Sequence, residues 1–433
     1  MKTQRAEPGL CAALIALTVL ICSAILTTFA LTGPDDGPRS GAEAGSAARH
    51  GGATARAVGT ADWVGTWSAS PGEAGSAPTD GHTVRNVVHT SLGGSRARIT
   101  LSNLLGTEPL HIGNASVAVA ADGAAAVPGT LREVSFAGRP SVTVWPGEQV
   151  VSDPAVLPVP EDGHLLVTVH VPAPGSGTVT LHARARQTSY LAAGNRTLDT
   201  QGSAYTMRTT SWHYLTAVDV LNPSARGTVV AIGDSLTDGT GSTPGADRRW
   251  TDVLAARLRE GRWGYGVVNQ GISGNRVLRN GTGPSAVSRF QRDVLDRPGA
   301  RVVVIALGIN DIIRPPAPAD PAALTTGLRQ LAERARARGL RVVGATLMPF
   351  EGHRRYTPAL DAVREQVNAA IRGGTLFDAV LDFDRSLRDP RAPHRLDPAY
   401  DCGDHLHLND AGYARMAGSV DLATLIGDGS ARL

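Results

Sequence analysis

The feature that most constrains this chain is a short apolar run that stops at a polar turn. Residues Val229–Ile232 are apolar, and Gly233, Asp234 and Ser235 follow at once. A continuous apolar run of strand length that ends in turn residues is typical of a buried parallel strand. Ligands of open α/β sheets bind beyond the carboxyl ends of such strands. Ser235 therefore lies where a nucleophile would act, although a serine at a strand end often only caps the next helix.

Strands and helices alternate from this run to the C-terminus. Apolar runs are separated by stretches with helical spacing of apolar residues, such as Leu324, Leu328 and Leu331. The alternation predicts a parallel, doubly wound sheet with helices on both faces, a three-layer α/β/α domain that we assign to residues 223–433. The expected strands are 228–232, 266–271, 301–307, 341–347 and 376–383, and the expected helices are 249–260, 284–296, 321–338, 358–372 and 410–425.

Residues 61–222 carry a different pattern. Short segments rich in Val, Thr, Ile and Leu alternate with Gly, Pro, Asn and Asp turns, and every second residue of 96–101 is polar. Short strands at regular spacing, without a long helical pattern between them, predict an all-β sandwich domain. The expected strands are 83–92, 96–101, 116–120, 141–145, 165–170 and 177–182.

The first 33 residues contain an apolar segment. No charged residue occurs in 9–33, and the basic residues Lys2 and Arg5 precede it. Its length suits a bilayer span of about 20 residues, and the charge asymmetry favours a cytoplasmic N-terminus. Because the apolar core of a signal peptide is shorter, about 7–15 residues, we favour a signal anchor over a cleaved signal peptide for 1–33. Either alternative predicts an extracytoplasmic protein, anchored to the membrane if the segment is uncleaved and secreted otherwise.

Composition limits what the remaining residues can do. Residues 34–60 are dominated by Gly, Ala, Ser, Arg and Asp, which predicts a disordered linker. Two of the three cysteines lie in the apolar segment, so Cys402 has no partner for a disulfide in the exported part. The formal net charge is +3 and the basic residues are dispersed, so we expect no nucleic-acid partner. We expect a monomer.

Three further polar clusters lie at ends of the expected α/β sheet. One spans 269–276 at the end of the second strand, and one spans 308–311 at the end of the third. Another, at 404–412, follows the last strand. Since the carboxyl ends of parallel strands meet at one edge, we expect these clusters to line one site with Ser235.

The four blocks resemble those of the GDSL/SGNH hydrolase superfamily of serine esterases and acylhydrolases, and they come in the family's order. They are Gly-Asp-Ser-Leu at 233–236, a glycine at Gly274, Gly-x-Asn-Asp at 308–311 and Asp-x-x-His at 404–407. The resemblance extends from Thr228 to the C-terminus. It implies the SGNH type of three-layer fold and a site that needs neither cofactor nor metal.

The resemblance also implies a role for each residue. Ser235 would attack an ester carbonyl once His407 takes its proton, because a serine hydroxyl is otherwise a weak nucleophile. Asp404 would orient the His407 ring and stabilise its charged form. The oxyanion hole would consist of the backbone N–H groups of Ser235 and Gly274 and the side-chain amide of Asn310.

The residues leave alternatives open at the fourth block. His405 could be the base in place of His407, or Asp404, His405 and His407 could ligate a metal. A catalytic zinc normally takes three protein ligands, and no separate cluster with ligand spacing stands out. We expect Asp234 and Asp311 to be structural and to bond loop N–H groups beside the site.

A looser similarity concerns the first half. The segments 63–67 and 101–103 resemble an arylesterase-like subgroup associated with xylan-degrading gene clusters, in which a β-sandwich precedes the catalytic domain. The sequence thus predicts an exported serine esterase that hydrolyses a small-molecule or polysaccharide ester through an acyl-enzyme, with acetylated polysaccharide as the first candidate. The alternatives are a lipid or aryl-ester acylhydrolase and an inactive cell-surface carbohydrate-binding protein. An inactive protein should lack a nucleophile, base or oxyanion donor, and none is missing.

Overall fold

The structure is a computed structural model that describes residues 62–76, 80–173, 175, 177–314 and 320–427. All of them belong to one compact unit, Ala57–Leu433. The predicted anchor or signal peptide at 1–33 and the predicted linker at 34–60 lie outside the described residues. Within the described residues, no helix has the length and apolar character needed to cross a membrane.

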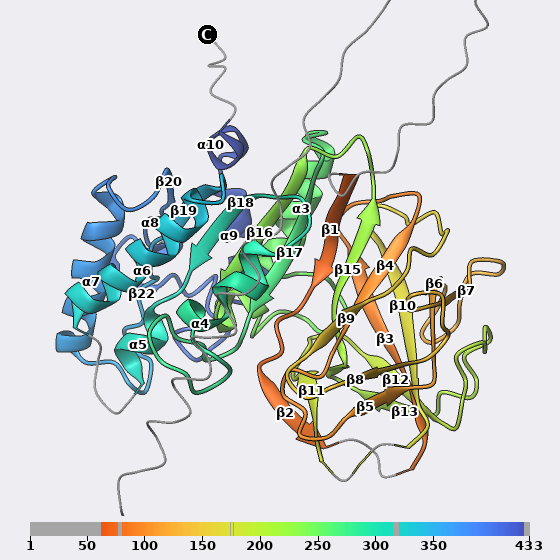
Figure 1. The fold of residues 1–433 in the computed structure, drawn as a ribbon. Helices are drawn as coiled ribbons and strands as arrows, with labels where there is room; N and C mark the ends of the chain where they lie inside the picture. The colour runs from red at the N-terminus through yellow and green to blue at the C-terminus, as the bar shows by residue number, and fades with distance from the viewer. Residues whose placement is uncertain (1–61, 77–79, 174, 176, 315–319, 428–433) are drawn as a thin grey trace, which may run out of the picture. The chain divides into compact units, whose positions relative to one another are not determined.

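The first half consists mainly of antiparallel strands (Figure 1). The two larger sheets have the orders β1-β15-β4-β9 and β13-β12-β3-β10-β6-β7, and smaller ones have the orders β14-β11-β2 and β5-β8. Each of the six expected strands overlaps an observed one. The strands are β1 (Trp63–Ser68), β2 (Glu73–Ser76), β3 (His82–Thr90), β4 (Ala97–Ser102), β5 (Leu110–Ile112), β6 (Asn114–Val119), β7 (Arg132–Val134), β8 (Val142–Val144), β9 (Gln149–Val151), β10 (Gly163–Val171), β11 (Thr178–His182), β12 (Ser189–Ala193), β13 (Met207–Thr209), β14 (Trp212–His213) and β15 (Leu215–Leu221).

The two larger antiparallel sheets share one hydrophobic cluster. Val84 of β3 and Val167 of β10 come from one sheet, and Ile99 of β4 and Val218 of β15 come from the other. All four are completely buried. A shared core of this kind explains why many Val, Leu and Ile residues of this half lie in short strands rather than in helices.

The second half contains a five-stranded parallel sheet with the order β17-β16-β18-β19-β20. Its strands are β16 (Gly227–Gly233), β17 (Tyr265–Gly271), β18 (Ala300–Ala306), β19 (Arg341–Ala345) and β20 (Ala379–Leu381). The helices are α2 (Ser235–Asp238), α3 (Trp250–Glu260), α4 (Ala286–Phe290), η2 (Gln291–Leu295), α5 (Ile309–Ile313), α6 (Pro321–Arg336), α7 (Pro358–Arg372), α8 (Phe383–Leu387), α9 (Asp410–Gly418) and α10 (Leu422–Ile426), and β21 (Arg388–Asp389) pairs with β22 (Ala392–Leu396).

Helices cover both faces of the parallel sheet (Figure 1). Val230 and Ile232 of β16 pack in a cluster with residues of α4, α6 and α7, while Val229 and Ala231 pack in another with residues of α3, α9 and α10. The alternation along one strand therefore fills two cores, as a doubly wound sheet requires. The face of α6 predicted from its apolar spacing is buried in the first cluster.

Two predicted helices are each divided in the structure. The segment 284–296 forms α4 and then the π-helical η2, and 410–425 forms α9 and α10. The second division has a local cause: the Asp421 side chain accepts a hydrogen bond from the Thr424 N–H and caps a new helix. The predicted strand 376–383 is shorter, because α8 begins at Phe383.

Strand β1 lies beside β17, the edge strand of the parallel sheet (Figure 1). The Gly65 N–H donates to Thr228 Oγ1 at 3.0 Å, and the Val267 N–H donates to Ser91 Oγ at 2.9 Å. A Cβ atom at Gly65 would lie only 2.8 Å from Val268 Cγ1. The β-rich half thus covers an edge that would otherwise expose backbone donors and acceptors.

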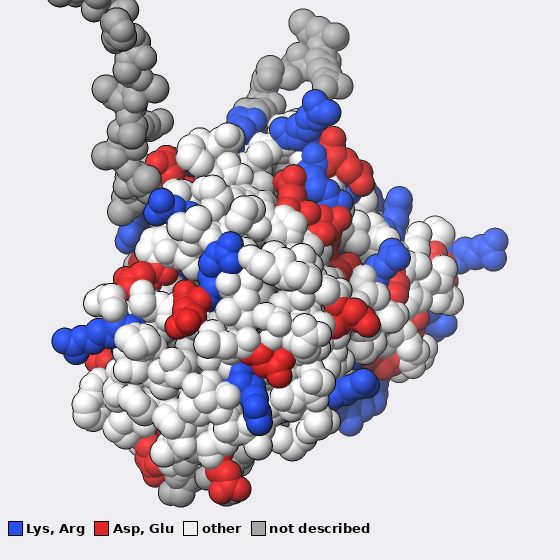
Figure 2. Space-filling view, turned by 90° about the vertical axis from the view of Figure 1, so that its right-hand side faces the viewer, with Lys and Arg blue, Asp and Glu red and all other residues white. Residues whose placement is uncertain are grey.

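Charged residues are mixed on the face of the molecule that Figure 2 presents. Arg side chains are scattered there among Asp and Glu and among neutral residues. On this face neither sign forms a continuous patch.

We predict that Gly65→Ala destabilises the protein by about 1–3 kcal/mol, because the added methyl group has no room against Val268. Urea unfolding of both proteins measures the difference. The matched control is Gly418→Ala, where a Cβ meets no atom within 4 Å. Equal stability of the two variants would contradict the close approach of β1 to β17.

Candidate active site

A tight turn places Ser235 at the carboxyl end of β16. The Asp234 side chain, rather than that of Ser235, caps α2 by accepting from the Leu236 N–H at 3.1 Å. A Cβ at Gly233 would lie 2.0 Å from Thr237 Oγ1, so only glycine fits between the strand and the helix. Since Asp234 does the capping, the Ser235 hydroxyl is available for other contacts.

The Ser235 hydroxyl belongs to a hydrogen-bonded row with His407 and Asp404. Ser235 Oγ lies 2.8 Å from His407 Nε2, and His407 Nδ1 lies 2.6 Å from Asp404 Oδ2. Asp404 Oδ1 also accepts the N–H groups of Leu406 and His407. Burial alone would raise the pKa of Asp404, but the hydrogen bonds from the His407 ring and backbone hold that pKa well below its ordinary value. Asp404 is therefore ionised beside the imidazole at neutral pH.

His405 and the possible metal ligands have other arrangements. His405 Nδ1 lies 2.7 Å from Asp401 Oδ2, and it is His407 that contacts Ser235. Among the described residues, the groups with three converging ligand atoms are Asp401, Cys402 and Asp404, and Asp361, Glu365 and His394. Neither group combines Asp404 with His405 and His407.

The predicted oxyanion donors lie at the ends of neighbouring strands. Gly274 follows β17 with a φ of 82°, a left-handed conformation that favours glycine. Asn310 lies in the first turn of α5, which follows β18. Its Nδ2 donates to Asp234 Oδ2 at 3.3 Å, and its Oδ1 accepts from Arg314 Nε at 2.8 Å. Because an amide has two N–H bonds, one is left for a ligand.

All five predicted site residues line one cleft of about 790 Å³. They are Ser235, Gly274, Asn310, Asp404 and His407. The structure therefore brings together residues that are up to 172 positions apart in the sequence.

The two acids expected to be structural do bond loop N–H groups. Asp311 accepts the N–H groups of Val277 and Leu278 at 2.8 and 3.0 Å, and Asp234 accepts that of Leu236. Burial raises the pKa of Asp234 to about 6.

Residues 231–415 match the model of the GDSL-like lipase/acylhydrolase family. This match supports the assignment of residues 231–415 to the GDSL/SGNH hydrolase superfamily. The family implies hydrolase activity on esters.

Solved structures similar to this chain include a GDSL-like lipase from Bacteroides thetaiotaomicron, with 19% identity over 46% of this chain and 88% of that one and a TM-score of 0.35. They also include a carbohydrate acetylesterase from Sinorhizobium meliloti, with 16% identity over 44% and 95% and a TM-score of 0.35. A search of curated proteins found no match.

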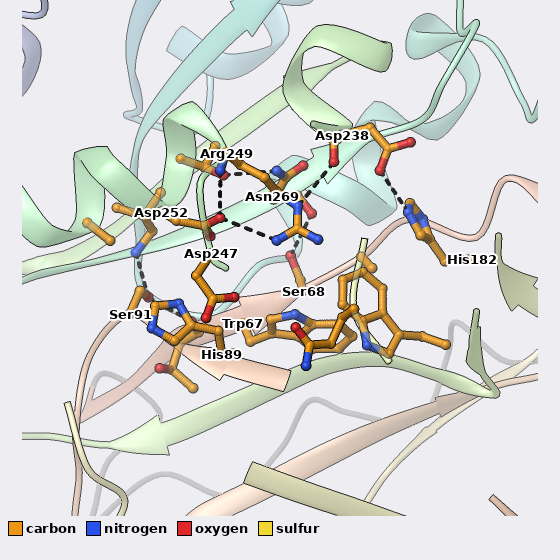
Figure 3. A pocket seen from close by; sticks show the side chains of 17 residues that line it. Trp67, Ser68, His89, Ser91, His182, Asp238, Asp247, Arg249, Asp252 and Asn269 are labelled. Carbon is orange, nitrogen blue, oxygen red and sulfur yellow. Dashed lines mark hydrogen bonds and ion pairs between the residues drawn. The ribbon is translucent and has the colours of Figure 1, made fainter. Parts of the chain in front are cut away.

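A buried ion pair holds the end of α2, the helix that begins at Ser235, and the sequence did not indicate it. His182, at the end of β11, points toward Asp238, the last residue of α2 (Figure 3), and Nε2 lies 2.9 Å from Asp238 Oδ1. Asp238 Oδ2 accepts the N–H and hydroxyl of Ser273, the residue before Gly274. His182 is in a distant strand and no local pattern marks it, whereas Asp238 is at least part of the polar turn.

The two ring nitrogens of His182 show its charge state. Nδ1 lies 2.8 Å from the carbonyl oxygen of Ser70, and Nε2 faces the Asp238 carboxylate. Both partners are acceptors, so both nitrogens must carry hydrogen. Burial opposes this charge, but Asp238 raises the pKa of His182, and His182 in turn keeps the pKa of Asp238 below its usual value.

We predict that His182→Gln lowers the free energy of unfolding by about 3 kcal/mol at pH 6, because it leaves the buried Asp238 carboxylate without its cation. The raised pKa of His182 stabilises the fold fully below its unfolded pKa of about 6.5. That contribution disappears as pH rises through the folded-state pKa. The difference in the free energy of unfolding between wild type and variant should therefore become smaller at alkaline pH.

Urea unfolding across pH 5 to 9 measures this difference. The matched control is His111→Gln. Because the His111 side chain is exposed, this substitution should change the free energy of unfolding by less than about 0.5 kcal/mol. A large loss that stays constant with pH would contradict a charged His182.

Proposed function

We propose that this protein is an exported serine esterase that hydrolyses carboxylic esters through an acyl-enzyme. The row of hydrogen bonds from Ser235 through His407 to Asp404 carries the proposal. It opens into a cleft that Gly274 and Asn310, the proposed oxyanion donors, also line.

The mechanism has two acyl-transfer steps. As Ser235 Oγ attacks the ester carbonyl, its proton moves to His407 Nε2, and ionised Asp404 stabilises the imidazolium. The oxyanion accepts hydrogen bonds from the N–H groups of Ser235 and Gly274 and from Asn310 Nδ2. Expulsion of the alcohol takes the proton from His407. Water, deprotonated by His407, then attacks the acyl-enzyme and releases the acid.

The lining of the cleft favours a short acyl group on a hydrophilic alcohol. Ile313 and Leu406 are its only large aliphatic residues among those described, and the other lining residues are glycine, polar or charged. A long acyl chain needs a continuous apolar surface, which this cleft does not offer. Acetyl esters of a polysaccharide are therefore the first candidate substrate, in agreement with the looser sequence resemblance of the β-rich half. Lipid or aryl esters are the second.

The proposal includes export and a β-sandwich. The uncharged segment 9–33 and the basic residues before it support export, with the membrane as a partner if the segment is retained. The hydrophobic cluster shared by two antiparallel sheets supports a sandwich in the first half. An inactive carbohydrate-binding protein would not need the hydrogen bond between Ser235 and His407.

We predict that the full chain in detergent hydrolyses p-nitrophenyl acetate and that Ser235→Ala lowers kcat/KM by about four to six orders of magnitude. The variant should keep the wild-type circular dichroism spectrum, because Ser235 does not cap α2. Ser203→Ala, at an exposed serine of the β-rich half, is the matched control. A folded wild type without turnover would favour the binding protein, and an active Ser235→Ala would require another nucleophile.

We predict that Asn310→Ala lowers kcat by about 10²–10³ with a smaller change in KM, because the amide contributes mainly to the transition state. Steady-state kinetics on the same ester separate the two constants. Unchanged turnover would remove Asn310 from the oxyanion hole and leave the nucleophile assignment intact.

A further inference from the structure

Four arginines line the same cleft as Ser235. They are Arg184, from the β-rich half, and Arg314, Arg354 and Arg355, from the hydrolase half. The face in Figure 2 mixes the two signs of charge, whereas the cleft gathers cations beside a nucleophile.

The carboxylates of the cleft do not neutralise these cations. Glu73 pairs with Arg184 at 3.0 Å, and Asp404 is held by His407. Among the described residues, Arg314, Arg354 and Arg355 form no ion pair. These three guanidinium groups thus line the cleft without an ion pair to any described residue, although the nearby Asp234 carboxylate partly offsets the lowering of the Arg314 pKa.

Two of these guanidinium groups are positioned by neutral acceptors. Arg314 Nε donates to Asn310 Oδ1, and Arg355 Nη1 donates to the carbonyl oxygen of Ile313 at 3.2 Å. A guanidinium has five N–H donors, so each group keeps donors for a ligand. Besides burial, the positive charges of Arg355, Arg276 and Arg184 lower the pKa of Arg314, in agreement with their proximity.

Guanidinium groups that line one cleft repel each other, and a bound anion would relieve that repulsion. Guanidinium groups bind carboxylates and sulfates with two parallel hydrogen bonds. A substrate that carries a carboxylate or a sulfate would offset the repulsion among the guanidinium groups.

We propose that the preferred substrate is a hydrophilic, short-chain ester that also carries a fixed negative charge, a carboxylate or a sulfate, bound by Arg354 and Arg355 near the scissile bond. This inference rests on the proposed esterase function and specifies its substrate class. The polar lining favours a soluble acidic ester over an anionic lipid.

Pairs of esters that differ from each other by a single negative charge test the inference with the full chain. Mono-4-nitrophenyl succinate and its methyl ester differ by one charge on the acyl side. 4-Acetoxybenzoate and its methyl ester differ by one charge on the alcohol side. The variants are Arg354→Gln, Arg355→Gln and the double variant, and Arg329→Gln, exposed on α6, is the matched control.

In the double variant we expect kcat/KM for the anionic ester of one pair to fall about tenfold more than for its neutral partner. For each ester, the ratio of kcat/KM between variant and wild type is compared, so that the intrinsic reactivity of the ester cancels. The pair that responds identifies the side of the ester that carries the charge. Added NaCl should reduce the same preference in the wild type, because salt screens exposed charges.

Equal losses on both members of each pair would overturn the inference. So would a charge preference found only with micelles of short-chain phosphatidylglycerol, which would indicate a lipid. Failure of the esterase function itself is distinguishable, since the neutral esters would then not be hydrolysed by the wild type either.

Discussion

The buried ion pair between Asp238 and His182 supports the candidate site from beneath. Helix α2 has four residues, too few to be stable without tertiary contacts. Its last carboxylate accepts hydrogen bonds from His182 and twice from Ser273, so the charge is satisfied on both oxygens. A buried charge is tolerated only when it is paired and hydrogen-bonded in this way. One carboxylate therefore fixes both the turn that carries Ser235 and the loop that carries Gly274.

The charged groups around Ser235 differ between the side of His407 and the side of Asn310. On the base side, Asp404 is ionised and directed at His407. On the oxyanion side, burial raises the pKa of Asp234 to about 6, so this carboxylate is still mostly ionised at pH 7. The Asn310 amide donates to Asp234 Oδ2, and its Oδ1 accepts from the Arg314 guanidinium. An amide donor and a cation thus lie next to the acid on this side, whereas Asp404 faces the imidazole on the other.

The sequence predicted what depends on local patterns. The strand ends that carry the site residues lie within a few residues of their expected positions, because apolar runs and turn residues are local signals. Strand β1 was not among the expected strands, and its Gly65 makes a close approach to Val268 of β17 and Thr228 of β16 that no local pattern indicates. The pair of His182 with Asp238 joins residues 56 positions apart in different halves of the chain. Periodicity does not encode contacts of this kind.

The end of β11 connects the β-rich half to the chemistry in two ways. His182 supplies the buried cation beneath the catalytic turn, and Arg184, only two residues later, lines the cleft. Between them the chain leaves the strand, and the left-handed backbone of Arg184 departs from the alternation that would direct residues 182 and 184 to the same face. The β-rich half therefore contributes to the proposed catalytic site, because His182 contacts the turn that carries Ser235 and Arg184 lines the cleft.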